Sequence, residues 1–295
     1  MSSLTQEQLN KSLWAAADDM RKSMSADDYK DYLLGLVFFK NLSDEILYEV
    51  VDLVENRKPE SLDEAQRIFE RYYLSEDKDL LEEEIRKKFG CFIKPESTFS
   101  HLAQEVENRT FMLSSLSQIF RDIEQSQGLF YEGLFEDFDI NSKKLGKTAA
   151  EANKLISSVI TQLADIDFHA YGHDALGDAY EYLISKFASE SGKKAGEFYT
   201  PRAVSRLLAR IVTDGQEHKN AFSVYDPTMG SGSLLLQVKN FIVDSPTLNL
   251  TNKIQYFGQE IKNQTYNLAR MNMILHGVSS SQQLSLIHIS EPTRH

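Results

Sequence analysis

The chain has 295 residues, and at about 100–200 residues per domain this length predicts two domains or one large one. An apolar fraction of 41% and a charged fraction of 26% are ordinary for a soluble globular protein and exclude global disorder. The only cysteine, Cys91, excludes an intrachain disulfide and a cysteine-rich zinc site, and it fits a cytoplasmic location. The longest apolar run covers residues 33–39, whereas a membrane span needs about 20 apolar residues, so we expect no membrane association.

The net charge of −12 is unevenly distributed. Residues 1–150 carry 30 acidic and 19 basic side chains, whereas residues 151–295 carry 14 and 13. A protein that grips DNA by itself usually shows a basic excess in some segment, and neither half shows one. If nucleic acid is the substrate, we expect a partner protein to supply part of the contact with it.

The first half of the chain is predicted to be mostly helical. Apolar residues at helical spacing predict helices within 9–20 and 29–42, and Ser25 is a plausible N-cap of the second. The charged segment 75–88 predicts a helix that ends at Gly90. Residues 141–149 are short, polar and basic, which is typical of a linker, so we expect a helical domain over 1–150.

The character of the sequence changes after residue 150. Helices are predicted over 152–163 and 173–187, and Pro201 is predicted to open another in its first turn. An alternating pattern follows, with strands predicted at 221–225 and 253–257 and helices at 233–243 and 262–275. Strands that alternate with helices predict a parallel, doubly wound sheet, although only two strands are clear.

One turn lies between the first predicted strand and its helix, and it reads Asp226-Pro-Thr-Met-Gly230-Ser231-Gly232-Ser233. Glycines at such a turn let the backbone come close to a ligand, and ligands of open α/β sheets bind outside the carboxyl ends of the strands. Glu260 ends the second strand, where a carboxylate can accept hydrogen bonds from both hydroxyls of a ribose. The combination predicts a nucleoside-containing cofactor.

The residue types narrow the choice of cofactor. The dinucleotide pattern Gly-x-Gly-x-x-Gly is incomplete, because Leu235 occupies the position of its last glycine. This departure argues against the interpretation as a nicotinamide-dependent dehydrogenase. The phosphate-loop pattern is absent, and Asp226 would repel a pyrophosphate. A cationic ligand such as S-adenosylmethionine fits better. The plainer alternative is a tight turn with a solvated aspartate.

A second motif, Gly-Glu-Phe-Tyr-Thr-Pro-Arg at 196–202, precedes the helix that Pro201 opens. Its adjacent aromatic residues, Phe198 and Tyr199, would stack on an adenine or cover a methionine group. By itself the motif also fits an ordinary aromatic contact ahead of a helix. His169 and His173 have metal-ligand spacing, but no third ligand type is near, so we expect no metal site.

Taken in order, these motifs resemble those of the adenine-specific DNA methyltransferases, and within them the modification subunit (HsdM) of type I restriction–modification systems. The resemblance rests on Gly-Glu-Phe-Tyr-Thr-Pro at 196–201, Asp-Pro-x-x-Gly-Ser-Gly-Ser at 226–233 and Gly-Gln-Glu at 258–260. Residues 177–192 and 262–275 also look like that family, and the likeness covers about 5–280. It implies a helical N-terminal domain followed by a Rossmann-like S-adenosylmethionine-dependent methyltransferase domain.

The resemblance also implies roles and partners. It assigns cofactor binding to three sets of residues: Glu197, Phe198, Tyr199, Thr200, Pro201 and Arg202; Asp226, Gly230, Ser231, Gly232 and Ser233; and Glu260. The expected reaction moves a methyl group from S-adenosylmethionine to the exocyclic nitrogen of an adenine flipped out of the duplex. The expected partners are a specificity subunit, a restriction subunit, a second modification subunit and double-stranded DNA.

The family usually holds the flipped base with an Asn-Pro-Pro-aromatic motif, and no proline of this chain follows an asparagine. We therefore expect no catalytic residue in this chain, an incomplete methyltransferase domain over 151–283, and the catalytic motif beyond the residues given. Residues 284–295 resemble translated sequencing-adapter DNA, so we expect a non-native tail; the alternative is a genuine short strand followed by a tail. The alternative function is a catalytically inactive module that binds cofactor or partners in an assembly.

Overall fold

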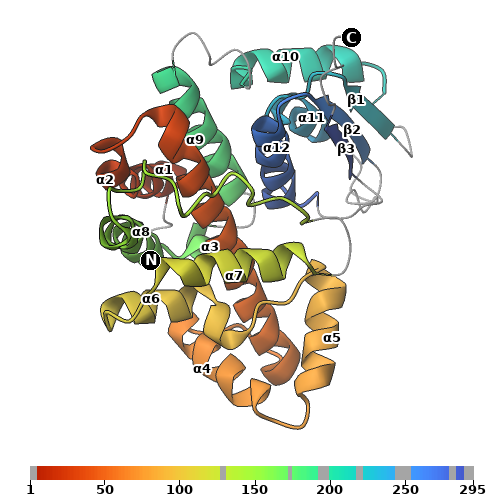
Figure 1. The fold of residues 1–295 in the computed structure, drawn as a ribbon. Helices are drawn as coiled ribbons and strands as arrows, with labels where there is room; N and C mark the ends of the chain where they lie inside the picture. The colour runs from red at the N-terminus through yellow and green to blue at the C-terminus, as the bar shows by residue number, and fades with distance from the viewer. Residues whose placement is uncertain are drawn as a thin grey trace, which may run out of the picture. The chain divides into compact units, whose positions relative to one another are not determined.

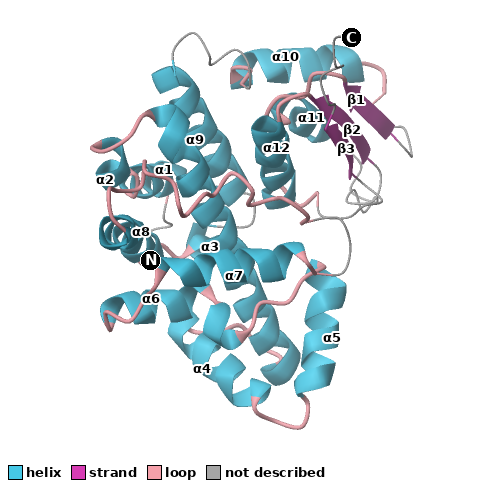
Figure 2. Ribbon diagram, viewed as in Figure 1, coloured by secondary structure: helices cyan, strands magenta, loops and turns pink. Residues whose placement is uncertain are grey.

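The computed structural model describes residues 5–126, 131–171, 175–191, 199–216, 222–242, 254–278 and 284–288. The chain divides into two compact units, residues 1–173 and 174–295. The first unit is helical, and the second combines helices with a small sheet (Figures 1 and 2). Within the described part of the chain, every helix is too short or too polar to cross a membrane.

The first unit is built around one long helix, α3 (Ala26–Glu55). The segments around it are α1 (Gln6–Ala15), α2 (Asp18–Arg21), α4 (Leu62–Tyr73), α5 (Lys78–Phe89), η1 (Pro95–Ser97), α6 (Phe99–Glu107), α7 (Leu113–Glu124), α8 (Ala149–Ala164) and η2 (Phe168–Tyr171). Ser25 is the N-cap of α3 and Gly90 ends α5 in the left-handed conformation, as the sequence predicts.

The centre of α3 is buried because other segments pack around it. Leu33, Leu36 and Phe39 are fully buried. Gly35 makes room for the ring of Phe138, because a Cβ at this glycine would lie 3.2 Å from Phe138 Cδ2. Phe39 meets Phe120 edge-on, with ring centroids 5.5 Å apart. Aromatic and aliphatic side chains therefore form the core of this unit together.

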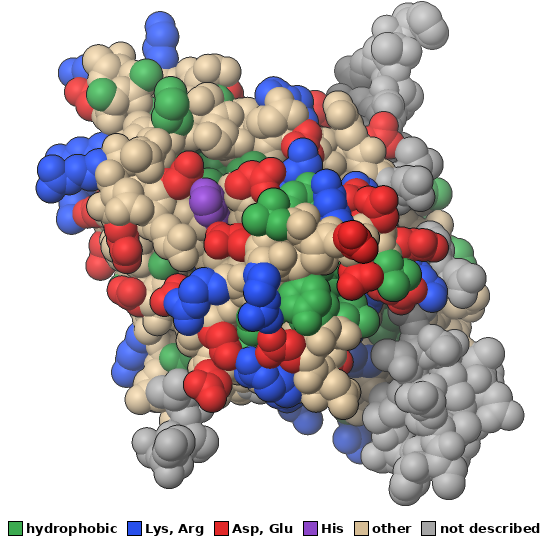
Figure 3. Space-filling model, turned by 90° about the horizontal axis from the view of Figure 1, so that it is seen from below, with side chains coloured by type: hydrophobic (Ala, Val, Ile, Leu, Met, Phe, Trp, Pro, Cys, Tyr) green, Lys and Arg blue, Asp and Glu red, His purple; other side chains and the backbone are tan. Residues whose placement is uncertain are grey.

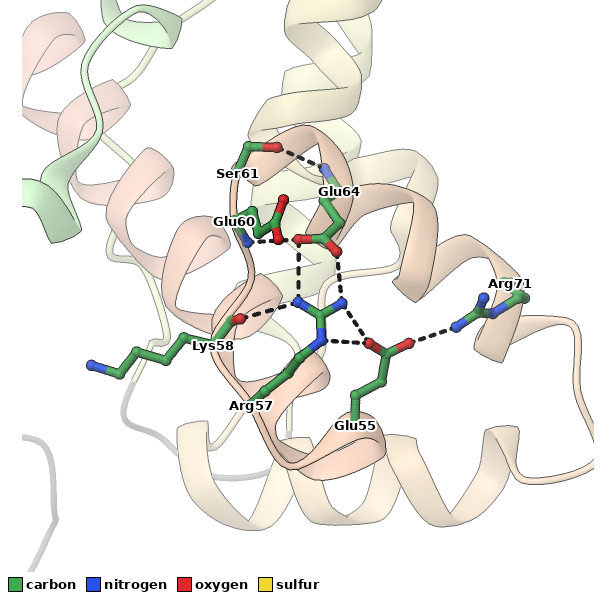
Figure 4. Close-up of polar contacts among 7 residues, drawn as sticks. All are labelled: Glu55, Arg57, Lys58, Glu60, Ser61, Glu64 and Arg71. Atoms are coloured by element: carbon green, nitrogen blue, oxygen red, sulfur yellow. Dashed lines mark hydrogen bonds and ion pairs between the residues drawn. The ribbon is translucent and has the colours of Figure 1, made fainter.

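The turn between α3 and α4 is held by charged side chains (Figure 4). Asn56 ends α3 in the left-handed region with φ of 52°. Arg57 Nη2 lies 2.6 Å from both Glu55 Oε2 and Glu64 Oε1, so one guanidinium joins the end of α3 to the start of α4. Ser61 caps α4 by accepting the backbone N–H of Glu64.

The expected linker at 141–149 is instead part of the helical unit. Leu145 is buried, Lys144 Nζ lies 2.6 Å from Asp28 Oδ1, and Tyr32 donates to the Asp139 carbonyl. Helix α8, which we expected to lie beyond a boundary at 150, packs against α6, α2 and α3. The observed division therefore falls at 173/174, because α8 buries its apolar face in the helical unit.

The second unit contains three parallel strands in the order β1 (Phe222–Asp226), β2 (Ile254–Glu260) and β3 (Leu284–His288). Its helical segments are α9 (Ala175–Ser191), α10 (Arg202–Thr213), α11 (Ser233–Gln237), η4 (Val238–Asn240) and α12 (Asn263–Leu275). The helix predicted over 233–243 is shorter than expected, because the chain tightens into η4 after Gln237. Strand β3 lies in the segment that we assigned to a non-native tail, and it agrees with the alternative of a genuine short strand.

Helices cover one face of this sheet (Figure 1). Val224, Tyr256 and Leu286 point to the core, where they pack with residues of α11 and α12. Tyr225, Phe257 and Ile287 alternate with them and are 56%, 38% and 52% exposed. The described residues leave this second face uncovered, and it holds a hollow of about 280 Å³.

Candidate cofactor site

The turn after β1 folds as a compact loop that its own residues shape. Asp226 ends β1, and its Oδ1 accepts the backbone N–H of Thr228 at 2.9 Å. Gly230 and Gly232 have φ of 55° and 79°, a region that residues with a Cβ rarely adopt. Gly232 is the N-cap of α11, so the turn leads directly into that helix. The conformation explains both glycines of the motif.

The turn is fastened to the end of β2 by Met229. Its backbone N–H donates to the Gln259 carbonyl at 3.0 Å, and its side chain is 4% exposed. Gly258 makes this contact possible, since a Cβ there would lie 2.4 Å from Met229 Sδ. Asp226 pairs in register with Gly258, so the carboxyl end of β1 lies beside the Gly-Gln-Glu segment.

Glu260 is the last residue of β2 and is 8% exposed. Its Oε1 accepts the backbone N–H of Lys262 at 2.9 Å, which fixes the carboxylate at the strand end. Because β1 and β2 are parallel neighbours, Glu260 and the glycine turn lie at the same edge of the sheet. The sequence prediction that joined these elements is consistent with their placement.

The serines of the turn point inward. Ser231 and Ser233 are 1% and 4% exposed, and their Oγ atoms lie 3.0 Å apart. Asn272 of α12 donates from Nδ2 to the Ser231 carbonyl at 2.9 Å. Burial raises the pKa of Glu181 of α9, and the nearby Ser233 acts on this pKa in the opposite direction. A side chain of α12 is thus hydrogen-bonded to the backbone of the turn.

Sequence reasoning did not identify Glu181, Asn272 or Met229. A signal for Glu181 was present: Gly177, Glu181, Ile184 and Ala188 recur at helical spacing, and all of them are buried. A carboxylate in such a buried stripe needs a partner, because a buried charge without one is costly. The signal was missed because Glu181 lies within a segment that reads as an ordinary core helix.

The second predicted motif is described in part. Glu197 and Phe198 lie outside the described residues, and Tyr199 and Thr200 are half-buried. Pro201 is the N-cap of α10. Arg202 begins that helix, and its Nη2 lies 2.7 Å from Asp178 Oδ1 of α9.

Asp178, Glu181 and His276 form a group that could hold a metal ion, with ligand atoms within 4.8 Å of one another. Nδ1 of His276 lies 2.9 Å from the Asn272 carbonyl. The guanidinium of Arg202 forms an ion pair with Asp178, so this side chain already supplies one positive charge to the three residues.

A helical unit precedes an α/β unit that carries this turn and acid, and one family model matches each of these two parts of the chain. The model described as HsdM N-terminal domain matches residues 9–163, and the model described as N-6 DNA Methylase matches residues 171–291. The chain belongs to the HsdM family, the methyltransferase subunits of type I restriction–modification systems.

Individual relatives agree with this placement. The type I restriction enzyme MpnII methylase subunit of Mycoplasma pneumoniae is 35% identical over 287 residues, 92% of this chain and 50% of the relative. The MjaVIII methylase subunit of Methanocaldococcus jannaschii is 32% identical over 259 residues, 85% of this chain and 38% of the relative. This chain therefore spans half or less of the length of these curated relatives.

Among solved structures, a type I restriction–modification system methyltransferase subunit from Streptococcus thermophilus matches with a TM-score of 0.89 at 46% identity. The match covers 98% of this chain and 61% of that one. The helical unit and the small parallel sheet are thus those of the family.

Proposed function

We propose that this chain supplies the cofactor-binding part of a type I DNA adenine methyltransferase that uses S-adenosylmethionine. One observation carries the proposal: two left-handed glycines shape the turn after β1, and a buried Glu260 ends the neighbouring strand. A turn without Cβ atoms lets a ligand approach the backbone, and the carboxylate can accept two ribose hydroxyls. These residues fit a nucleoside that carries a positively charged methionine group.

In this proposal each residue has a separate task. Glu260 binds the ribose, the backbone of 230–233 contacts the methionine end, and Asp226 shapes the turn through its bond to Thr228. S-adenosylmethionine, when bound, supplies a methyl group activated by its sulfonium, and the proposed acceptor is the exocyclic nitrogen of a flipped adenine. The base-holding Asn-Pro-Pro-aromatic motif is not among the 295 residues, so the proposal assigns cofactor binding to this chain.

The charge of the chain supports a DNA contact that is shared with other subunits. The net charge is −12, and on the face shown in Figure 3 acidic and basic side chains are interspersed among the described residues. Since phosphate contacts require a local excess of Lys and Arg, we assign part of the DNA contact to other subunits. The proposed partners are a specificity subunit that selects the sequence, a restriction subunit and a second modification subunit.

Isothermal titration of the chain with S-adenosylmethionine tests the proposal. We expect saturable binding, and we expect Glu260→Ala to weaken it by roughly 10–100-fold, since hydrogen bonds to a charged group contribute about 1.5–3 kcal/mol. Glu83→Ala, at an exposed position of α5, is the matched control and should bind normally. A wild-type chain that does not bind, or a Glu260→Ala variant with unchanged affinity, would refute the assignment.

A further inference from the structure

Three side chains of the second unit that can ligate a metal ion lie together where α9 packs against α12 (Figure 1). Asp178 and Glu181 lie one turn apart on α9, and His276 directly follows α12. Their ligand atoms, one from each residue, lie within 4.8 Å of one another. Sequence spacing does not predict this group, because only the packing of two helices brings His276 to the two carboxylates.

Glu181 is buried with one oxygen unsatisfied. The residue is 6% exposed, and its Oε1 has no hydrogen-bond partner among the described residues. A carboxylate oxygen in this state costs stability, because it has lost its contact with water and gained no donor in exchange. A metal ion bound between the two helices would remove this cost, since buried charges in proteins are paired or coordinate metals.

His276 presents a ring nitrogen to the same place. Its Nδ1 lies 2.9 Å from the Asn272 carbonyl, which can only accept a hydrogen bond, so Nδ1 carries the proton of the neutral ring. Nε2 then holds the lone pair, and it faces α9, because a Cβ at Gly177 would lie 2.8 Å from it. Metal-binding histidines are oriented in this way, with the other ring nitrogen donating to a carbonyl or carboxylate.

Two positively charged side chains lie near the group and limit its attraction for a metal ion. Arg202 Nη2 lies 2.7 Å from Asp178 Oδ1, and Lys239 Nζ lies 3.5 Å from the His276 carbonyl oxygen. Neither of them donates a hydrogen bond to Glu181 Oε1. A carboxylate has two oxygens, so Asp178 can keep its ion pair with Arg202 and still contribute a ligand.

We propose that Asp178, Glu181 and His276 form a binding site for Zn²⁺ that joins α9 to the end of α12. An imidazole among the ligands favours a transition metal over Mg²⁺ or Ca²⁺, which prefer oxygen ligands. Zinc bonds to nitrogen and oxygen are about 2.0–2.2 Å long, which places tetrahedral ligand atoms about 3.3–3.6 Å apart, so the side chains must move inward by about 1 Å on binding. None of the three ligands is assigned to the cofactor, so the inference goes beyond the proposed function.

Isothermal titration of the chain with Zn²⁺, after removal of any affinity tag and treatment with a chelator, tests the site, with the melting temperature recorded in parallel. We expect saturable binding and a melting temperature that rises by several degrees, because a ligand bound only by the folded state stabilises it. Mg²⁺ at the same concentration should produce neither effect.

Two variants each remove one ligand. Glu181→Gln and His276→Gln should both weaken Zn²⁺ binding by at least about tenfold and abolish the rise in melting temperature. Glu190→Gln, the same substitution at an exposed position of α9, is the matched control and should bind Zn²⁺ as wild type does. If one ligand variant fails to fold, the other carries the test.

Arg202→Gln tests the third ligand. It removes the cation that competes for Asp178, so Zn²⁺ should bind several-fold more tightly than to wild type. Unchanged or weaker binding in this variant would exclude Asp178 as a ligand and overturn the site as proposed.

The remaining outcomes also refute the site. A wild-type chain that binds no Zn²⁺ overturns it, and so does binding that both ligand variants leave unchanged, since the ion then lies elsewhere on the chain. Equal stabilisation by Mg²⁺ would mean a general effect of charge instead of a site with an imidazole ligand. Because these titrations contain no S-adenosylmethionine, failure of the zinc site is distinguishable from failure of the proposed function.

Discussion

Lys40 and Asp44 form an ion pair inside the helical unit, where each side chain is 1% exposed. The ammonium of Lys40 also lies 4.8 Å from the ring centre of Phe168. Removing one partner of a buried pair leaves an uncompensated charge, so at pH 8, where Asp44 is ionised, we expect Lys40→Met to lower the free energy of unfolding by about 3–5 kcal/mol. Urea unfolding of the two proteins measures this difference.

A double variant distinguishes the contribution of the ion pair from the cost of leaving one charge unpaired. Replacing both charges, Lys40→Met with Asp44→Val, removes the desolvation cost as well as the attraction, so the loss should be smaller than in Lys40→Met alone. A single variant that costs less than about 1 kcal/mol would show that water reaches this site in solution.

Asp44 also makes stability depend on pH. Burial raises its pKa to about 6 from 3.8, although Lys40 acts in the opposite direction. A carboxyl whose pKa is higher in the folded state stabilises when protonated, so its contribution is complete below pH 3.8 and is lost as the pH rises through about 6. We expect wild type to gain roughly 1–3 kcal/mol from this group between pH 7 and 4.

The Asp44→Asn variant, which does not titrate at residue 44, is the reference for the stability that the wild type gains toward acid pH. Carboxylates with lowered pKa, such as Asp19 and Asp28, lose stability as the pH falls, so only the difference between wild type and variant isolates Asp44. The difference in unfolding free energy should grow toward acid. Parallel pH curves for the two proteins would count against a buried, titrating Asp44.

At the scale of elements, the contact between the glycine turn and β2 depends on the absence of one side chain. A Cβ at residue 258 would lie 2.4 Å from Met229 Sδ and 2.9 Å from Leu286 Cδ2. Gly258→Ala should therefore destabilise the second unit by about 1–3 kcal/mol, the usual cost of overpacking, and weaken cofactor binding. Urea unfolding followed by circular dichroism measures the first effect.

A second substitution should recover part of this loss. Met229→Ala removes the atom nearest the new methyl group, so the double variant should be more stable than the two separate losses predict. Gln255→Ala, on the exposed face of β2, is the control. If the losses simply add, Met229 does not pack against Gly258 in solution.

Elements with strong local signals were predictable from the sequence. The long apolar stripe of α3, the glycine after α5 and the proline before α10 lie where they were expected. Strand β3 was only the alternative to a non-native tail, because five residues carry little periodic signal and their pairing with β2 is formed by residues distant in sequence. The division at 173/174 was missed for the same reason, since it depends on where α8 packs.

The candidate site shows the same limit. Asp226, the two glycines and Glu260 form contiguous motifs, so their types and spacing identified them. Asn272 reaches the turn from a helix 41 residues away, and only packing brings it to Ser231. A single sequence does not encode such contacts as a motif.

At the scale of the whole molecule, two apolar surfaces of the second unit stand out. One is the face of the sheet that carries Tyr225, Phe257 and Ile287, and the other is a face of α10. Five apolar residues of α10 are 42–62% exposed: Val204, Leu207, Leu208, Ile211 and Val212. Scattered exposed apolar residues are normal, but a contiguous patch marks a surface that associates with protein.

We therefore expect the isolated chain to associate at increasing concentration. Replacing Leu207 and Ile211 together by Glu places charge at the most exposed positions of the α10 face, and it should reduce association without loss of helix content. Sedimentation velocity over a concentration series measures the effect. Leu74→Glu is the matched control, because Leu74 is 87% exposed but stands outside any such face, and it should leave association unchanged. A wild-type chain that stays monomeric at high concentration would show that this face does not mediate contacts between copies.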